Sequence, residues 1–382
     1  MNKAYKYRLY PTEEQETLLH KTFGCCRYVY NKALYWRKAA YDADNTSLSY
    51  SDTSYGLTAL KRQFPWLKEV DSIALQQSLR HLDTAYKNFF NVKGAKFPKF
   101  KSKRSSKKSY TTINQCGTVA VLDDRIKMPK IGKIKAAICR TAPDGWNLKS
   151  ATVSMTPDHK FYVSVLYEYE TVIIPHSIDP KNVIAFDYKS DGLYVDSNGD
   201  TCGSPKYYRK ALDKLAKEQR KLSRKTGSHK GEAKSGKYKK QQLKVNRTHR
   251  HIANQRLDFL HKLSTGIANR YDAVCVESLD MKAMSNSGFG NGKATMDNGY
   301  GMFVNMLEYK LHDRGKHLVK VDKWFPSSQL CSCCGYRNPE LKDLSVRKWT
   351  CPVCGTEHDR DHNSAINTLQ EGLRLLQLAD TA

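Results

Sequence analysis

The chain has 382 residues, enough for two or three domains that each bury a hydrophobic core. Its 64 lysines and arginines outnumber its 38 aspartates and glutamates, which gives a formal net charge of +26. This excess predicts a nucleic-acid partner, because so much like charge repels itself until a polyanion neutralises it. The N-terminus has no apolar signal segment, and no run approaches the roughly 18 apolar residues of a membrane helix. We therefore expect a cytoplasmic protein without a membrane partner, whose eleven cysteines form no disulfide framework.

The N-terminal part predicts a strand and then helices. Ala4–Tyr10 alternates as a strand, and the capping-box pattern that runs from Thr12 to Gln15 begins a helix. A second helix is expected over Ser72–Phe90, where apolar residues recur at steps of three and four. Its opposite face carries Ile73, Gln76, Arg80 and Lys87. Glutamine can pair with the major-groove edge of adenine and isoleucine can contact a thymine methyl, so this face is a candidate for reading a few base pairs. A solvated helix face is the alternative.

Short strands are predicted in the next part of the chain. Residues 93–110 are rich in lysine and serine, which indicates a linker or a loop that contacts phosphates. From Tyr110 to Tyr169, short alternating segments are separated by Gly, Pro and Asp turns. We interpret these segments as a small β-barrel to which the N-terminal strand returns.

A further α/β region begins after Pro180. Val183–Asp187 and Leu193–Asp196 predict an opening hairpin, and more strands are expected at Ala273–Val276 and Leu318–Val321. The Gly/Asn-rich segment Ser285–Gly301 predicts a loop, which is either disordered or a lid over a site at the end of the preceding strand.

Residues 206–250 predict a pair of basic helices interrupted by a loop around Gly227–Gly236. This segment contains 17 Lys or Arg and only three acidic residues. We expect it to contact the backbone of RNA or of an RNA–DNA heteroduplex, and a solvated helical face is the alternative. The candidate contacts are Arg220, Arg224, Lys239 and Arg247.

Two CxxC pairs have the spacing of a zinc site. Cys331 and Cys334 form the first pair, Cys351 and Cys354 the second, and a glycine follows each pair. Four thiolates at this spacing can surround one zinc ion, with no open position for catalysis. Cys333 is an alternative ligand inside the first pair, but Cys334 preserves the CxxC geometry. The sequence therefore predicts one structural zinc.

Three acids stand at strand ends or a helix start. Asp187 ends the apolar run Val-Ile-Ala-Phe, Glu277 ends Val-Cys-Val, and Asp361 lies in Asp-Arg-Asp-His-Asn. A carboxylate beside a buried strand is costly to desolvate unless it binds a cation or hydrogen-bond donors. In a basic protein, three such acids fit a site for two Mg²⁺ ions about 4 Å apart that hydrolyses phosphodiesters.

The order of these motifs resembles the transposon-encoded TnpB (OrfB) family, relatives of compact CRISPR effectors with a single RuvC nuclease. Phe-Pro-Ser-Ser before the first CxxC pair, Tyr7–Thr12, Thr22–Asn31 and Ile252–Lys262 extend the resemblance over nearly the whole chain. It implies a multidomain α/β fold. A wedge-type β-barrel (1–10 and 93–178) carries a helical recognition lobe (11–92), and an RNase H-like RuvC nuclease (179–325 and 357–382) contains a zinc ribbon (326–356).

The resemblance also implies a magnesium-dependent endonuclease of an insertion sequence. Such an enzyme uses a guide RNA from the transposon end, cleaves double-stranded DNA beside a short motif, and promotes retention of the transposon. Many relatives have glycine two residues after the first acid, which leaves Asp191 as an alternative to Asp187. Asp361 is preferred to Asp359 because asparagine follows it at two residues. A three-acid transposase and an RNA-guided DNA-binding regulator without cleavage are the alternative functions.

Overall fold

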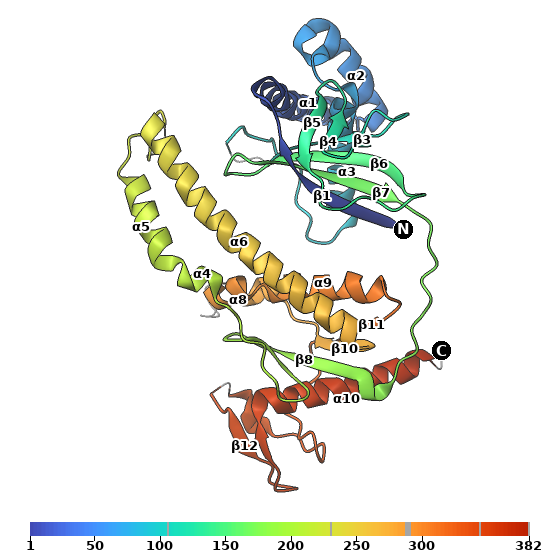
Figure 1. The fold of residues 1–382 in the computed structure, drawn as a ribbon, viewed down its shortest axis with the longest axis vertical. Coiled ribbons are helices and arrows are strands. Elements are labelled where there is room, and N and C mark those ends of the chain that lie inside the picture. Colours follow the sequence, from blue (N-terminus) through green and yellow to red (C-terminus); the bar gives the residue numbers. More distant parts are fainter. Residues whose placement is uncertain (105–106, 230, 287–291, 344, 381–382) are drawn as a thin grey trace. The chain divides into compact units, whose positions relative to one another are not determined.

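The computed structural model describes residues 1–104, 107–229, 231–286, 292–343 and 345–380. The chain forms two compact units, Met1–Thr171 and Val172–Ala382 (Figure 1). Within the described residues, no helix combines the length and the apolarity needed to cross a bilayer.

The first unit is built on a seven-stranded antiparallel sheet in the order β2-β6-β7-β1-β5-β4-β3. Its strands are β1 (Asn2–Tyr10), β2 (Lys108–Ile113), β3 (Ala120–Val121), β4 (Arg125–Met128), β5 (Gly132–Ala137), β6 (Asn147–Met155) and β7 (Phe161–Glu168). The N-terminal strand β1 pairs with both β7 and β5, which confirms that it returns to the later strands. The edges of the sheet are β2 and β3, and closure into a barrel stays a prediction.

Three helices accompany this sheet: α1 (Glu13–Asp44), α2 (Tyr50–Gln63) and α3 (Ser72–Asn91). The predicted capping box is present, with the Thr12 hydroxyl and the Gln15 side chain each bonded to the other residue's backbone amide. The predicted stripe of α3 is also confirmed, since Leu75, Leu79 and Leu82 are buried in one core with α1 and the sheet.

The second unit contains a four-stranded sheet in the order β11-β10-β8-β9. Its strands are β8 (Val183–Lys189), β9 (Leu193–Asp196), β10 (Ala273–Glu277) and β11 (His317–Val321). β8, β10 and β11 are parallel, and β9 returns antiparallel to β8 as the predicted hairpin.

Helices cover both faces of this sheet because its central strands are apolar on both sides. Ile184 and Phe186 of β8 pack with α9 (Tyr300–His312) and the C-terminal part of α6 (Gly236–Arg270). Val183 and Ala185 face the other way, toward α10 (Arg360–Asp380). A side chain at Gly372 of α10 would come within 2.2 Å of the Cys275 sulfur, so this glycine permits the close approach of helix and strand.

The predicted basic helical pair projects from this sheet (Figure 1). It consists of the short α4 (Tyr207–Lys210), α5 (Leu212–Ser223) and the first part of α6, and we call residues 206–250 the basic arm. The Gln241 side chain joins its two helices by donating to the Glu218 carbonyl at 3.0 Å and to its carboxylate at 2.7 Å.

The Gly/Asn-rich segment differs from the loop that its composition predicts. Residues 287–291 lie outside the described residues, but α7 (Met281–Met284) precedes them and α8 (Gly292–Asn298) follows them. The loop prediction is therefore wrong for α8, because three polar residues of this helix find buried partners that composition does not reveal. The cysteine-rich segment carries a 3-10 turn (Pro339–Lys342) and the two-stranded sheet of β12 (Lys348–Thr350) and β13 (Glu357–Asp359).

Candidate active site

Two of the predicted acids lie at the same edge of the parallel sheet. Phe186 of β8 is paired with Val276 of β10, and Asp187 and Glu277 follow one residue later on the two strands. The carboxyl ends of adjacent parallel strands meet at one edge, where α/β proteins usually bind ligands. The third acid, Asp361, lies in the first turn of α10, which packs along β8.

Two serine hydroxyls link the carboxylates of the strand ends. Ser364 Oγ lies 3.1 Å from Asp187 Oδ1 and 3.0 Å from Ser327 Oγ, and Ser327 Oγ is in very short contact with Glu277 Oε1. Ser327 donates its hydroxyl hydrogen to Glu277, and the single hydroxyl hydrogen of Ser364 is shared between Asp187 and Ser327. Sequence patterns predicted no role for these serines, although Ser327 lies in the Phe-Pro-Ser-Ser segment of the family resemblance.

The electrostatics of this edge favour a cation. Burial raises the pKa of Asp187 well above its usual value, and the neighbouring carboxylates of Glu277 and Asp361 raise it further. Burial also raises the pKa of Glu277, against the hydrogen bond from Ser327 that lowers it. Both acids resist ionisation while no cation compensates their charge, so a bound cation would favour the ionised form of each.

Asp361 already lies between two basic side chains. Its Oδ2 is 3.3 Å from Lys189 Nζ and its Oδ1 is 3.3 Å from the Arg347 guanidinium. All three residues line a cavity of about 390 Å³. Glu277 opens instead on a second cavity of about 400 Å³. Across the described residues, groups of three or more possible metal ligands within 4.8 Å of one another occur only among the ribbon cysteines and His358, so the oxygens of the three acids do not all lie within that distance.

The two alternative acids have other partners. Asp191 is exposed and its carboxylate lies 2.6 Å from Lys206 Nζ at the foot of the basic arm. Asp359 Oδ1 accepts hydrogen bonds from the backbone amides of Asp361 and His362, so Asp359 caps the first turn of α10. The preference for Asp187 and Asp361 over these two acids stays a prediction.

The four cysteines of the two CxxC pairs gather at one point. Their sulfur atoms all lie within 4.8 Å of one another, with Cys331–Cys354 and Cys334–Cys351 distances of 3.6 Å. This is the ligand set of a structural zinc site. Hydrogen bonds from the side chain and the backbone of Thr356 lower the pKa of Cys354 to about 6, which favours the thiolate that zinc requires.

A histidine that the spacing did not predict lies beside these cysteines. His358 Nε2 is 3.1 Å from Cys331 Sγ, and its ring lies against Trp349 in the small ribbon core. Cys333 is exposed and belongs to a separate group with Cys331 and His358, so the alternative ligand does not enter the four-sulfur cluster. Only the β12–β13 pairing, which places His358 opposite Trp349, reveals this residue.

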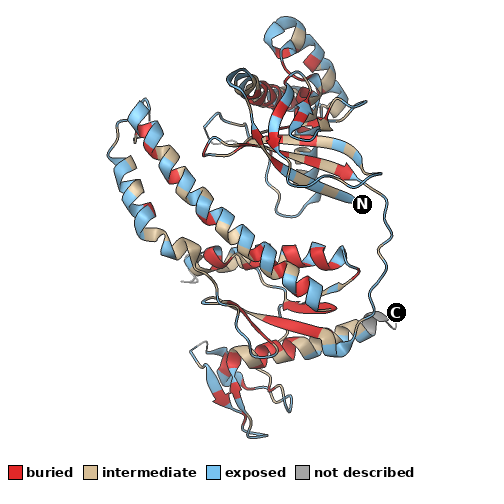
Figure 2. Cartoon of the chain, viewed as in Figure 1, coloured by how far each residue is buried: buried red, intermediate tan, exposed pale blue. Residues whose placement is uncertain are grey.

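The helices of the basic arm carry mostly exposed and half-buried residues (Figure 2). Arg220, Arg224, Lys239 and Arg247 are exposed on the basic arm. On α3, Gln76, Arg80 and Lys87 are exposed and Ile73 is half-buried. Two of them have partners within the protein, since Arg80 lies 4.6 Å from the Tyr50 ring centroid and Lys87 pairs with Asp83 at 3.1 Å.

Similarity to known proteins identifies the family. A protein of Streptomyces pristinaespiralis named "Putative RNA-guided DNA endonuclease" is 38% identical over 98% of this chain and 90% of its own length. The chain belongs to the IS605 OrfB/TnpB family. The InsQ protein of Escherichia coli, which has the same description, is 31% identical over 98% of this chain and 93% of the relative. A Cas12f1–sgRNA–target DNA complex aligns with 97% of this chain and 98% of that chain at a TM-score of 0.49 and 12% identity.

Three protein-family models match segments of this TnpB-family chain. They are the OrfB "Helix-turn-helix domain" over residues 1–46, the OrfB "Probable transposase" over 164–288 and the "Cas12f1-like, TNB domain" over 300–368. The first description does not fit the local structure, because residues 1–46 form strand β1 and one continuous helix, α1. The third match includes the four cysteines and Asp361.

Proposed function

We propose that this chain is an RNA-guided DNA endonuclease of an insertion sequence, which hydrolyses double-stranded DNA next to a short motif. The observation that carries the proposal is that Asp187 and Glu277 lie on adjacent parallel strands and are linked through Ser327 and Ser364, while Asp361 lies in the same turn of α10 as Ser364. Sequence relatives with the same description over nearly their full length support it. In the host cell, cleavage would promote retention of the transposon.

The donor set fits magnesium. Asp187, Glu277 and Asp361 would hold the ions, since magnesium prefers carboxylate oxygens together with water. When bound, two ions would stabilise the attacking water and the leaving oxygen of the phosphodiester. Ser327 and Ser364 would orient the two strand-end carboxylates. Lys189 and Arg347 now neutralise Asp361, and from this position beside the acid they would contact the scissile phosphate.

Recognition would be divided between protein and RNA. The basic arm presents exposed Lys and Arg, which hold phosphates but carry no sequence information. The exposed face of α3 around Gln76 can address only a few base pairs. Specificity for a long site would therefore come from base pairing with a guide RNA.

The order β11-β10-β8-β9, with helices on both faces, supports an RNase H-like nuclease over 179–325 and 357–382. The cysteine cluster supports a zinc ribbon at 326–356 within it. The wedge-type barrel (1–10 and 93–178) and the recognition lobe (11–92) complete the proposed organisation.

The deciding experiment is magnesium-dependent cleavage by the full chain purified with its RNA. The wild type should cut a guide-matched duplex, and a changed guide should move the cut to the new match beside the same motif. Asp187→Asn, Glu277→Gln and Asp361→Asn should retain RNA-directed DNA binding but lose cleavage. Asp272→Asn is the matched control, since it removes a buried acid at the other end of β10.

Each alternative gives a different result. RNA-dependent binding without cleavage by the wild type would identify a regulator, and joining of DNA ends would identify a transposase. Full cleavage by Asp187→Asn would overturn the acid assignment. A cut that survives ribonuclease treatment before assembly would overturn RNA guidance.

A further inference from the structure

Helix α8 is attached to the second unit by polar rather than apolar side chains. Thr295, Asp297 and Asn298 of this seven-residue helix are all at most 5% exposed. The Thr295 hydroxyl accepts from the Tyr188 hydroxyl of β8 at 3.3 Å. Buried polar groups need partners with defined geometry, so their contacts fix where a short helix lies.

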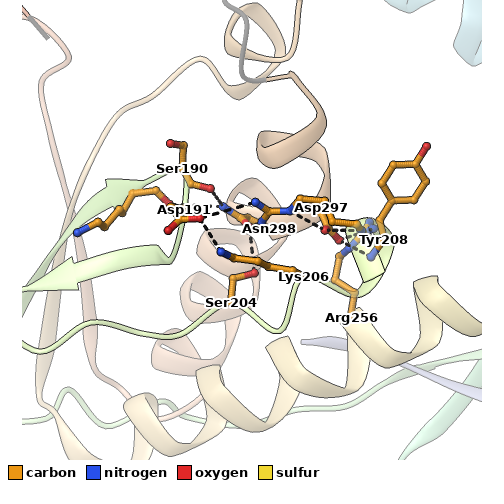
Figure 3. Close-up of polar contacts among 10 residues, drawn as sticks. Ser190, Asp191, Ser204, Lys206, Tyr208, Arg256, Asp297 and Asn298 are labelled. Carbon is orange, nitrogen blue, oxygen red and sulfur yellow. Dashed lines mark hydrogen bonds and ion pairs between the residues drawn. The ribbon is translucent and has the colours of Figure 1, made fainter. Parts of the chain in front are cut away.

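Asp297 joins α8 to the foot of the basic arm (Figure 3). Its fully buried carboxylate accepts from the backbone amides of Tyr208 and Arg209 at 2.9 and 3.1 Å and from Arg209 Nε at 3.2 Å. The Arg256 guanidinium of α6 is 3.7 Å away. One carboxylate thus binds both α4 and α6.

Asn298 joins the same foot to the turn after β8 (Figure 3). Its Nδ2 donates to the carbonyls of Lys189 and Ser190 at 3.4 and 2.7 Å. Its Oδ1 accepts from Ser204 Oγ at 3.0 Å and from the Arg209 guanidinium at 3.2 Å. All four hydrogen-bonding positions of the amide are therefore occupied.

The turn held by Asn298 carries a residue of the candidate active site. Lys189, whose backbone carbonyl accepts from Asn298, places its ammonium 3.3 Å from Asp361. Lys206 of the arm binds Asp191 on the other side of the turn at 2.6 Å. Gly299 connects α8 to α9 with a φ of +67°, and an added Cβ would lie 3.1 Å from Arg256 Cδ, so this connection favours glycine.

We propose that Asp297 and Asn298 are positioning residues that clamp the turn at residues 189–192 to the foot of the basic arm, and so fix Lys189 beside Asp361. Neither residue touches the candidate metal site itself. This inference rests on the proposed function only for its effect on cleavage, since the clamp is a property of the folded chain.

The test compares Asp297→Asn and Asn298→Ala with Asp272→Asn, each in the full chain. Asp272 is a matched control because it is also a buried acid, held by His176 at 2.8 Å and Lys316 at 3.7 Å, away from the clamp. Amide hydrogen exchange of residues 189–192 in the protein without RNA should rise in both clamp variants and not in the control. Single-turnover cleavage by the RNA-loaded protein at saturating magnesium should fall by about 100-fold, the scale of a misplacement of roughly 1 Å. RNA and DNA dissociation constants should change less than the cleavage rate, because the exposed candidate contacts Arg220, Arg224, Lys239 and Arg247 are unaltered.

Combining the clamp variants with Arg209→Gln tests directly whether Asp297 and Asn298 act through Arg209 of the basic arm. Loss of cleavage should be non-additive for Asp297→Asn with Arg209→Gln, and additive for Asp272→Asn with Arg209→Gln. Unchanged exchange at 189–192, or a cleavage rate that falls only in step with thermal stability in all three variants, would overturn the clamp. A wild-type protein that cuts no DNA with its RNA would overturn the proposed function instead. The clamp would then be tested only by the amide hydrogen exchange of residues 189–192.

Discussion

Asn363 connects the cysteine cluster to the helix that carries Asp361. Its Nδ2 donates to the Leu330 carbonyl at 2.6 Å, and its Oδ1 accepts from the Ser332 amide at 2.9 Å. The side chain is 1% exposed. Asn363→Ala removes both bonds, and it leaves the Ser332 amide without this acceptor while Asn367 still donates to the Leu330 carbonyl at 2.7 Å.

The expected cost follows from these contacts. A net hydrogen bond contributes about 1 kcal/mol and an unsatisfied buried donor costs about 1–3 kcal/mol, so the free energy of unfolding should fall by about 2–4 kcal/mol. For a unit of this size, the midpoint of its thermal transition should fall by about 4–16 °C. Cleavage should also decrease, because the first turn of α10 holds both Asp361 and Ser364.

Differential scanning calorimetry of the zinc-loaded full chain measures the first effect. Gln370→Ala is the control, since this exposed residue of the same helix makes one bond to the Ser332 carbonyl at 3.0 Å and should cost under about 1 kcal/mol. If Asn363→Ala destabilises the protein no more than Gln370→Ala, the two asparagine bonds do not anchor the helix to the cysteine cluster.

Other consequences concern charge, zinc and nucleic acid. Because the pKa of Asp187 is raised in the folded state, its ionisation destabilises the metal-free protein as pH rises through that pKa. Asp187→Asn should therefore raise the melting temperature of the metal-free protein at pH 8, and this gain should shrink toward acidic pH. A gain in melting temperature that is the same at every pH would contradict the reasoning. Native mass spectrometry should find about one zinc ion per wild-type chain and none in Cys351→Ser, whose zinc ribbon should become sensitive to proteases. A zinc-free wild type would refute the four-cysteine zinc site. Arg247→Gln should reduce, by about one unit, the slope of the logarithm of the RNA-binding constant against the logarithm of the salt concentration. An unchanged slope would exclude a phosphate contact by Arg247. Gln76→Ala should change the preferred flanking motif in a randomised-flank cleavage screen, and an unchanged motif would favour a merely solvated face.

Much of the fold could be predicted because its signals are local. Short apolar segments identified β8 and β9, the period of three to four residues identified α3, and the cysteine spacing identified the four-sulfur cluster. The ends of two apolar runs also placed Asp187 and Glu277 where the parallel pairing of β8 and β10 stops, although β8 itself continues to Lys189. Short α8 escaped prediction because it lies in a Gly/Asn-rich segment and its buried polar side chains find their partners far away in the chain.

The sequence by itself determined which residues are acidic, where the apolar strands end and which thiols have zinc spacing. Only the tertiary structure decided that Ser327 and Ser364 link two carboxylates, that Lys189 reaches Asp361, and that Asn298 holds the turn of Lys189. The reason is physical. Periodicity records which face of an element is buried, but a hydrogen bond between residues such as Ser364 and Asp187, 177 positions apart, depends on how helix and sheet pack.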